Sequence, residues 1–544
     1  MSEPNFSNTV IADRLEAFAA LLELAEANAY SARAYRRAAE LVRGTPALVA
    51  ELVRTGRVRE LRGIGPAIEA RLRELVETGE IEELRELERS TAPELVALGR
   101  LLGTSPARMA EIGRALGIRT AAELRAAAAL GRLSEVPGIG PKTEARLREG
   151  LARAERAPAP RGLTLNRAWA LAGTIAEALG GEVAGDVRRF RDLCERFAIV
   201  CSTRDPDAVL DAFAELPAIV AVLEREPGRA VGVTVEGVPV QVVVAPPERF
   251  GTELVRATGP VRFVERLEPL PEAADEDGVW AALGRAPCPP ELRGSPEDGA
   301  PPPDLLRRED VRGDLHCHST WSDGKASVLE MGRAARELGY EYLAICDHTV
   351  AVRVVPGLDA DAVRRQGEEI TAANEELAPF RILRGSECDI LPDGSLDLPD
   401  DVLAELEWVQ VSVHAGQRTS RAELTARVVE ALRHPAASCL SHPTGRLLNH
   451  RPPNALDLER VFEVALETGV ALEVNGLPDR LDLRDEHVRL ARQAGVPIVV
   501  STDAHSTVGL GNMRLAVGTA RRGGARVGDV LNTRSLAELA RRRR

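Results

Sequence analysis

The chain contains almost no lysine. Of its 544 residues, 70 are lysine or arginine, yet Lys142 and Lys325 are the only lysines. Chemistry that forms a Schiff base needs a side-chain amine. The first 140 residues hold no lysine at all, so we expect no Schiff-base lyase activity from that part of the chain.

Long apolar runs and cysteine pairs are also missing. No stretch reaches the length of about 18 apolar residues that marks a membrane-spanning helix, and the first residues, MSEPNFSNTV, lack a signal-peptide pattern. The seven cysteines include no CxxC pair, and an odd number argues against a disulfide framework. We therefore expect a cytoplasmic protein with no membrane contact.

Excess positive charge is absent as well. The formal net charge is −13, whereas proteins that bind nucleic acid through bulk charge are basic. Any binding to DNA must then use local devices. The terminal run RRRR (541–544) is one candidate, but short terminal charge runs are usually solvated tails.

The pattern of side chains changes along the chain and predicts several domains. Residues 10–155 carry apolar side chains at helical spacing, and residues 165–250 combine a helix with strands and a hairpin around Glu236-Gly237. Seven prolines between Pro287 and Pro303 indicate a linker. From residue 313 onward, strands and helices alternate, which is typical of a parallel β/α architecture.

Two short segments of the helical part are nearly identical. LRGIGPAIEARL (61–72) and VPGIGPKTEARL (136–147) each place Gly-Ile-Gly-Pro directly before a helix. The glycines allow a tight hairpin, and the N–H groups of the following helix N-terminus can bind a phosphate. This pattern is a helix-hairpin-helix and predicts nonspecific contacts with the DNA backbone at Gly63, Gly65, Gly138, Gly140 and Lys142.

A third segment, LLGTSPARMAEIGRAL (101–116), has Ser105 in place of the second glycine. We expect this degenerate copy to contribute mainly packing.

In the C-terminal part, most predicted strands end in a residue that can bind a metal ion. The candidates are His316, His318, Asp323, His348, Glu387, His414, His442, Asp503 and His505. The carboxyl ends of the strands of a β/α barrel meet on one face, so we expect these residues to converge. Nine nitrogen and oxygen ligands suit two or three divalent ions, Zn²⁺, Mn²⁺ or Fe²⁺. Cys317, Cys346 and Cys388 are expected to be buried apolar residues, because neighbouring side chains on a strand face opposite ways.

These motifs carry a resemblance to a known family. DLHCHSTWSDG, CDH, GSECDI, VSVH, SHPTGR and STDAH resemble the polymerase and histidinol phosphatase (PHP) domain. Upstream, AYRRAA (34–39), the hairpin motifs, GDVRR, PPERFG, TG (258–259) and WAALGRAPCPPELR resemble bacterial family X DNA polymerases that carry a C-terminal PHP domain. The resemblance covers essentially the whole chain.

The resemblance implies a division of the ligands among three ions. His316, His318, Glu387 and Asp503 would bind the first ion, and Glu387 would bridge to a second that His414 and His442 also bind. Asp323, His348 and His505 would bind the third. Arg446 and Arg480 would contact phosphate oxygens. The implied activity is that of a metal-dependent 3′→5′ exonuclease or 3′-end phosphoesterase for DNA repair, acting as a monomer on gapped DNA or 3′ ends.

The resemblance fails at the polymerase site. Family X polymerases bind two Mg²⁺ ions through an Asp-x-Asp pair and a third aspartate, but Arg196, Ala198 and Gln241 stand at those positions. The loop before them, in GDVRRFRDLCERFAIV (185–200), keeps its glycine and its arginines. We expect polymerase activity to be lost, and the arginines to contact DNA or to brace the fold.

The predicted fold class is multidomain α and α/β. It comprises helical DNA-binding domains at 1–90 and 91–155, a degenerate α+β nucleotidyltransferase-like palm at 156–250, a thumb-like segment at 251–286, a linker at 287–312 and a distorted (β/α)7 PHP barrel at 313–544. Three alternatives stay open: residual polymerase activity, a small-molecule phosphatase of the histidinol-phosphate kind, and a scaffold for DNA ends without catalysis.

Overall fold

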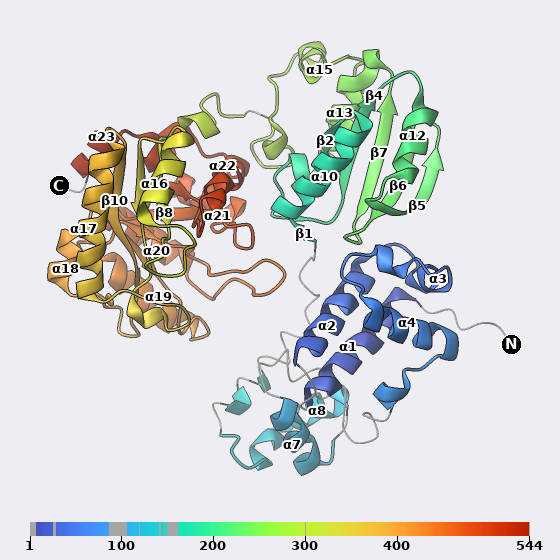
Figure 1. Cartoon of the computed structure of the whole chain (residues 1–544), viewed down its shortest axis with the longest axis horizontal. Coiled ribbons are helices and arrows are strands. Elements are labelled where there is room, and N and C mark those ends of the chain that lie inside the picture. Colours follow the sequence, from blue (N-terminus) through green and yellow to red (C-terminus); the bar gives the residue numbers. More distant parts are fainter. Residues whose placement is uncertain are drawn as a thin grey trace. The chain divides into compact units, whose positions relative to one another are not determined.

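The computed structural model describes residues 7–24, 29–85, 106–118, 120–140, 143–145, 147–148, 162–299 and 301–542 (Figure 1). The chain forms two compact units. Unit 1 comprises Met1–Leu163, Glu177–Gly180 and Glu195–Val244, and unit 2 comprises Thr164–Ala176, Gly181–Cys194 and Ala245–Arg544. The predicted palm therefore has residues in both units. None of the described helices is both long and apolar enough to cross a membrane.

Helices form the first part of unit 1. They are α1 (Asn8–Leu24), α2 (Ala29–Gly44), α3 (Val49–Arg54), α4 (Pro66–Thr78), α7 (Pro106–Leu116) and α8 (Ala121–Ala129). Side chains of α1–α4, such as Phe18 and Leu72, are buried in one apolar core, and those of α7 and α8, such as Ile112 and Leu124, in another. The helices α1–α4 and the helices α7 and α8 therefore have separate apolar cores.

Unit 1 also contains four strands and one helix of the predicted α+β part. These elements are β4 (Phe197–Ser202), α12 (Pro206–Glu215), β5 (Ile219–Glu226), β6 (Arg229–Thr234) and β7 (Pro239–Ala245). In a five-stranded sheet, β4, β7, β6 and β5 follow one another in this order, and β6 pairs antiparallel with both β5 and β7. The predicted hairpin around Glu236-Gly237 joins β6 to β7, with Gly237 in the left-handed region.

The elements of the chain between the helical part and the barrel include short helices and strands. They are β1 (Leu163–Thr164), α10 (Leu165–Leu179), β2 (Gly181–Ala184), α11 (Gly185–Arg188), β3 (Leu193–Cys194), α13 (Phe250–Thr258), α14 (Val261–Glu265) and α15 (Glu276–Leu283). Cys288, Leu292 and Leu305 are buried in one cluster with Trp280. Part of the segment predicted as a linker is therefore packed against α13–α15.

Seven parallel strands form a nearly closed barrel at the C-terminal end of unit 2. They are β8 (Gly313–Cys317), β9 (Tyr342–Ile345), β10 (Arg381–Asp389), β11 (Trp408–Ser412), β12 (Cys439–Leu440), β13 (Ala471–Asn475) and β14 (Ile498–Ser501). Their order in the sheet is the order of the sequence, from β8 to β14. A parallel bridge between Cys317 and Ala504 brings the first and last strands together. The predicted barrel is confirmed.

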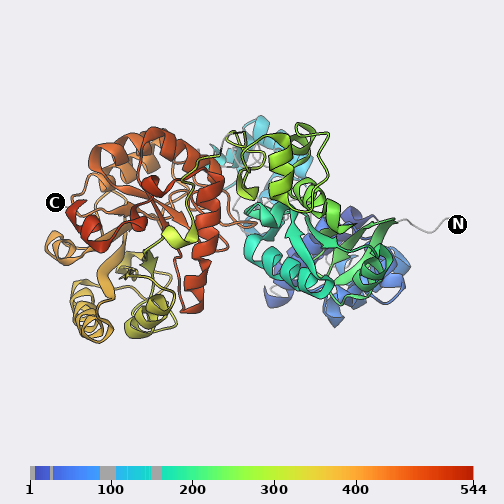
Figure 2. The ribbon, with the colours of Figure 1, turned by 90° about the horizontal axis from the view of Figure 1, so that it is seen from above.

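Helices cover the outside of this barrel (Figure 2). A further helix, α23 (Leu536–Arg542), packs instead against inward residues at the amino ends of the strands. The outer helices are α16 (Val328–Glu337), α17 (Ala360–Leu377), α18 (Asp400–Glu405), α19 (Arg421–Leu432), α20 (Leu458–Thr468), α21 (Asp485–Ala494) and α22 (Met513–Arg522). Their apolar faces pack on outward strand residues such as Ile345, Val409 and Val500. The predicted burial of the cysteines is confirmed, since all seven are buried and none forms a disulfide.

The inward side chains of the barrel change from apolar to polar along the strands. Near the amino ends, Tyr342, Trp408 and Val499 are buried in a cluster that Leu539 of α23 also joins. Residues on one face of a strand alternate with a period of two. Farther along the same strands, this face carries buried polar residues: Gln410, Ser412, Glu473, Asn475 and Ser501. The barrel thus has an apolar base and a polar end.

The strands of the barrel pack closely around Gly385 of β10, and a substitution there can test this packing. A Cβ added there would lie 2.6 Å from the carbonyl oxygen of Ile345 and 2.8 Å from Sγ of Cys346. The backbone of β9 cannot move away without losing its hydrogen bonds to β10. We expect Gly385→Ala to lower the free energy of unfolding of the barrel by about 1–3 kcal/mol, measured by denaturant titration. Gly528→Ala is the control, because a Cβ there meets nothing within 4 Å. Equal midpoints for both variants would contradict this packing.

Candidate metal centre

The nine residues predicted as metal ligands lie together at the carboxyl ends of the barrel strands. They come from different elements: His316 from β8, His318 and Asp323 from the segment after it, His348 after β9, Glu387 from β10, His414 after β11, His442 after β12, and Asp503 and His505 after β14. Eight of the nine belong to three groups in which the donor atoms lie within 4.8 Å of one another, and the ninth, His442, contacts Glu387. The predicted convergence is therefore present.

Glu387 lies at the middle of this cluster. Its Oε1 is 2.9 Å from Nε2 of His442 and 3.5 Å from Nε2 of His414, and its Oε2 is 2.9 Å from Nδ1 of His348. The carboxylate is 1% exposed. Burial alone would raise the pKa of Glu387, but the surrounding histidines lower it well below its usual value. An ionised carboxylate is thus held in the centre of the ring of histidines.

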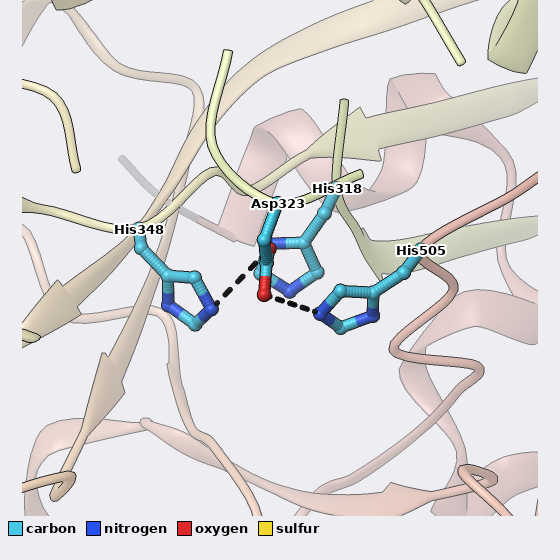
Figure 3. A group of neighbouring side chains, drawn as sticks. All are labelled: His318, Asp323, His348 and His505. Carbon is cyan, nitrogen blue, oxygen red and sulfur yellow. Dashed lines mark ion pairs between the residues drawn. The ribbon is translucent and has the colours of Figure 1, made fainter. Parts of the chain in front are cut away.

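Asp323 organises a second group with three histidines (Figure 3). Its Oδ2 lies 3.3 Å from Nε2 of His505 and its Oδ1 lies 3.7 Å from Nε2 of His348, while the ring of His318 stacks on that of His505. Burial opposes ionisation of Asp323, yet the hydrogen bond with His505 lowers its pKa to about 2. Burial likewise lowers the pKa of His505, but Asp323 raises it to about 9.

The chemistry of these donors fits divalent metal ions. Among the side chains that the structure describes, Nε2 of His316 and Nδ1 of His318 are buried without a hydrogen-bond partner. Nδ1 of His348 and Oε2 of Glu387 face each other at 2.9 Å but do not form a hydrogen bond of good geometry. Buried polar atoms normally have a partner. Imidazole nitrogens and carboxylate oxygens are ligands of Zn²⁺, Mn²⁺ and Fe²⁺. The groups overlap, since His318 and His348 each belong to two of them.

A second layer of polar side chains orients the cluster. Oε1 of Glu473 lies 2.6 Å from Nδ1 of His316, and Asp389 lies 3.2 Å from Nδ1 of His414. The side-chain amide of Asn475 donates to Asp503 over 3.0 Å. Partners of this kind fix the orientation and tautomer of metal-binding histidines.

Sequence reasoning missed Glu473 and Asp389, although their spacing carried a signal. Asp389 is two residues after Glu387 on β10, and Glu473 is two residues before Asn475 on β13. Residues two apart on a strand face the same side. An acid at this spacing from another polar residue, within an otherwise apolar strand, therefore marks the supporting layer.

The two arginines predicted to contact phosphate differ in their surroundings. The guanidinium of Arg446 donates to the carbonyl oxygens of Arg480 and Leu481 and to the carboxylate of Asp192. Arg480 instead approaches the centre, with Nε 3.6 Å from Oδ2 of Asp503. Its Nε and Nη1 are buried and have no hydrogen-bond partner among the described side chains.

Both Gly-Ile-Gly-Pro hairpins are partly described. Gly63 and Gly138 have φ values of 108° and 78°, a conformation that favours glycine. The carbonyl oxygen of Gly65 accepts from the N–H of Glu69 at 2.9 Å, which opens α4.

The second hairpin repeats this geometry. The carbonyl oxygen of Gly140 accepts from the N–H of Glu144 at 3.0 Å, and a Cβ at Gly65 or Gly140 would meet nothing within 4 Å. The backbone at these two positions is therefore open to a ligand. Lys142 and Ser105, named from the sequence, lie outside the described residues.

The arginines of the GDVRR loop are paired with side chains of unit 2. Arg188 donates to both carboxylate oxygens of Glu276, at 2.7 and 3.1 Å, and Arg293 donates to the same two oxygens at 2.9 and 3.0 Å. Arg189 donates to the carbonyl oxygen of Thr258 at 2.5 Å and also pairs with Asp186. Burial opposes ionisation of Glu276, but the two arginines hold its pKa below the usual value. Arg188 and Arg189 therefore brace the fold.

The three positions expected from the sequence to correspond to the polymerase aspartates carry no acid. Arg196 precedes β4 and is exposed, Ala198 is buried within β4, and Gln241 lies on the neighbouring strand β7. Within the described ranges, none of the donor groups that suit a metal ion includes a residue of β4 or β7.

Substitution of Glu473 tests whether the second layer of polar side chains supports metal binding. Replacing it by glutamine removes the negative charge beside His316 while keeping the size of the side chain. We expect Glu473→Gln to weaken metal binding about 10- to 100-fold, measured by chelator competition and metal content. Glu463→Gln on the exposed face of α20 is the control and should leave the affinity unchanged. Equal affinities for both variants would rule out this role.

Different parts of the chain are similar to different known proteins and domain families. Residues 6–81 match the family model of a helix-hairpin-helix domain, and residues 97–153 match that of a SAM-like helix-hairpin-helix tandem. A probable phosphatase of Acetivibrio thermocellus is 30% identical over 208 residues, which is 36% of this chain and 81% of the relative. Another, from Thermoanaerobacter sp. (strain X514), is 27% identical over 40% of this chain and 89% of its own length.

One relative matches almost from end to end. The DNA polymerase/3′-5′ exonuclease PolX of Bacillus subtilis (strain 168) is 32% identical over 556 residues, which cover 96% of this chain and 97% of the relative. Together with the hairpin domains and the phosphatase-like part, this similarity shows that the chain belongs to the PolX family.

Proposed function

We propose that this chain is a metal-dependent 3′→5′ exonuclease or 3′-end phosphoesterase acting on DNA, and that its polymerase site is inactive. The observation that carries the proposal is the buried cluster around Glu387, whose unpaired donors suit divalent ions. It is supported by the helix-hairpin-helix domains of the same chain, which are DNA-binding modules, and by the exonuclease named among the relatives.

The residues of the barrel would share the work as follows. His316, His318, Glu387 and Asp503 would hold one ion, Glu387 with His414 and His442 a second, and Asp323 with His348 and His505 a third. Bound divalent ions supply an activated water at neutral pH and neutralise charge on a phosphate.

The protein itself would orient the substrate. Arg480 has Nε 3.6 Å from Oδ2 of Asp503, and its Nε and Nη1 are buried without a hydrogen-bond partner. It would donate to a phosphate oxygen of the terminal nucleotide. Glu473 and Asp389 would keep the histidine rings in fixed orientations. The hairpins at Gly63–Gly65 and Gly138–Gly140 would bind the DNA backbone through main-chain N–H groups.

Loss of polymerase activity is inferred from charge. Arg196 stands where a family X polymerase has an aspartate that binds Mg²⁺, and a cation there repels the ion that catalysis requires. The loop arginines that would contact a triphosphate already pair with Glu276 and Asp186. A triphosphate would have to displace these carboxylates.

The nuclease is tested by incubating purified protein and Mn²⁺ with a 3′-recessed duplex labelled at its 5′ end. We expect shortening from the 3′ end, and a rate at least about 100-fold lower in His316→Ala or Asp503→Ala, because bound ions contribute several kcal/mol to transition-state stabilisation. His434→Ala, a histidine outside the cluster, is the control and should keep full activity. Undiminished degradation by the cluster variants would reject the proposal.

A small-molecule phosphatase is the second candidate, and the probable phosphatases among the relatives favour it. The same protein preparations distinguish the two functions when assayed on p-nitrophenyl phosphate. Fast turnover of this monoester without shortening of DNA would select the second candidate.

The proposed loss of polymerase activity is tested in a variant without exonuclease activity, because degradation of the primer would hide its extension. In His316→Ala protein with Mg²⁺ and deoxynucleotides, we expect no extension of a primer on a gapped template, because no acid stands at positions 196, 198 and 241. Primer extension in this background would show that the alignment with the polymerase aspartates is wrong. Extension that appears only after Arg196→Asp, Ala198→Asp and Gln241→Asp are combined would support it.

A further inference from the structure

The loop Gly185–Cys194, which resembles a nucleotide-binding loop, lies against the barrel within unit 2. Phe190 has a φ of 55°, and its ring is so close to Gly518 of α22 that a Cβ on Gly518 would lie 2.0 Å from the ring. The guanidinium of Arg522, also on α22, donates to the carbonyl oxygen of Arg189 at 3.0 Å. The loop is thus held on the helix that follows the last metal ligands of the barrel.

Beside this contact, Asp192 pairs with Arg446. Oδ2 of Asp192 is 2.8 Å from Nη1 of Arg446, whose side chain is only 7% exposed. Arg446 uses its other two nitrogens to hold main-chain carbonyl oxygens, Nε to Arg480 at 2.9 Å and Nη2 to Leu481. Asp192 is therefore the carboxylate that bonds directly to a buried guanidinium, which clamps one turn of the barrel. Asp482 of that turn is a second carboxylate in the electrostatic range of Arg446.

The clamped turn carries Arg480. Nε of Arg480 is 3.6 Å from Oδ2 of the ligand Asp503, and the next residue, Leu481, has a φ of 44°, which is strained for leucine. Asp482 of the same turn accepts hydrogen bonds from the N–H and hydroxyl of Thr444, two residues after the ligand His442. A strained turn keeps its shape only where its surroundings hold it, and Arg446 makes two of the bonds that do so.

We propose that Asp192 is a positioning residue for the hydrolytic site of the barrel. By fixing Arg446, it fixes the turn that directs Arg480 toward the phosphate, so the disused nucleotide loop serves as an internal brace of the nuclease. This inference rests on the proposed function, because it assigns a phosphate contact to Arg480. Asp192 itself touches neither substrate nor metal.

The test compares Asp192→Asn with the wild type at saturating Mn²⁺. We expect kcat to fall about tenfold, because small displacements of a group that stabilises the transition state are costly, while metal content and the KM for DNA stay unchanged. Turnover of bis(p-nitrophenyl) phosphate should fall by the same factor, since the defect lies at the phosphate and not in DNA binding. Asp192→Glu keeps the charge and should recover part of the rate.

Glu195→Gln is the matched control, because it removes the same charge three residues away at an exposed position. It should leave kcat unchanged. A higher KM for DNA with normal turnover of the small diester would overturn the proposal in favour of a direct DNA contact. A loss of metal content or of melting temperature that alone accounts for the lower rate would overturn it in favour of general stabilisation.

A double variant tests the route through Arg480. If Asp192 acts through Arg480, adding Asp192→Asn to Arg480→Gln should lower kcat no further than Arg480→Gln does alone. Two effects that multiply would overturn the proposal.

Calorimetric titration of the Mn²⁺-loaded protein with inorganic phosphate distinguishes a failure of the positioning role of Asp192 from a failure of the proposed nuclease function. Asp192→Asn should weaken phosphate binding even if the wild type cleaves neither DNA nor the diester, in which case only the proposed function fails. Equal phosphate affinity and equal turnover in wild type and Asp192→Asn would reject the brace.

Discussion

The burial of Glu387 among histidines is the interaction on which the rest of the barrel depends. A carboxylate that is 1% exposed has lost almost all of its hydration, and an uncompensated buried charge costs several kcal/mol. The histidine nitrogens within 2.9–3.5 Å of its two oxygens reduce this cost only if they point toward it. Cations placed between these donors would compensate the charge more fully, which is why the cluster suits divalent metals.

The histidine rings must therefore be held in a fixed orientation. The carboxylate of Glu473, which lies deeper in the barrel than the histidines, contributes to this. Glu473 is fully buried and accepts from the N–H of His442 and the hydroxyl of Ser501 in addition to its contact with His316. One carboxylate thereby fixes groups from three strand ends. The apolar base of the barrel, to which Leu539 contributes, lies nearer the amino ends of the strands than this layer.

Much of the candidate metal centre could be predicted from the sequence because most of the candidate ligands follow an apolar run, and the ends of parallel strands must meet. Glu473 was hidden inside such a run, VALEVNG, where a single acid does not interrupt the apolar pattern. The residues that pair with the loop arginines could not be predicted from the sequence for another reason. Arg188 and Glu276 are 88 residues apart, and no local pattern links two surface-type residues at that separation. The backbone hairpins at Gly63 and Gly138 could be predicted, because the positive φ angle that favours glycine there depends only on neighbouring residues.

The arginines of the GDVRR loop are paired with groups of the protein itself. A guanidinium that is only partly exposed requires an anion, and a triphosphate can fill that role only where metal ions hold it in place. In this structure the anion comes from the protein: Glu276 joins Arg188 and Arg293 in a bidentate arrangement like the one that guanidinium groups form with phosphate. Because this carboxylate is part of the chain, the arginines are paired without a bound nucleotide. The same loop places Asp192 within 2.8 Å of the guanidinium of Arg446.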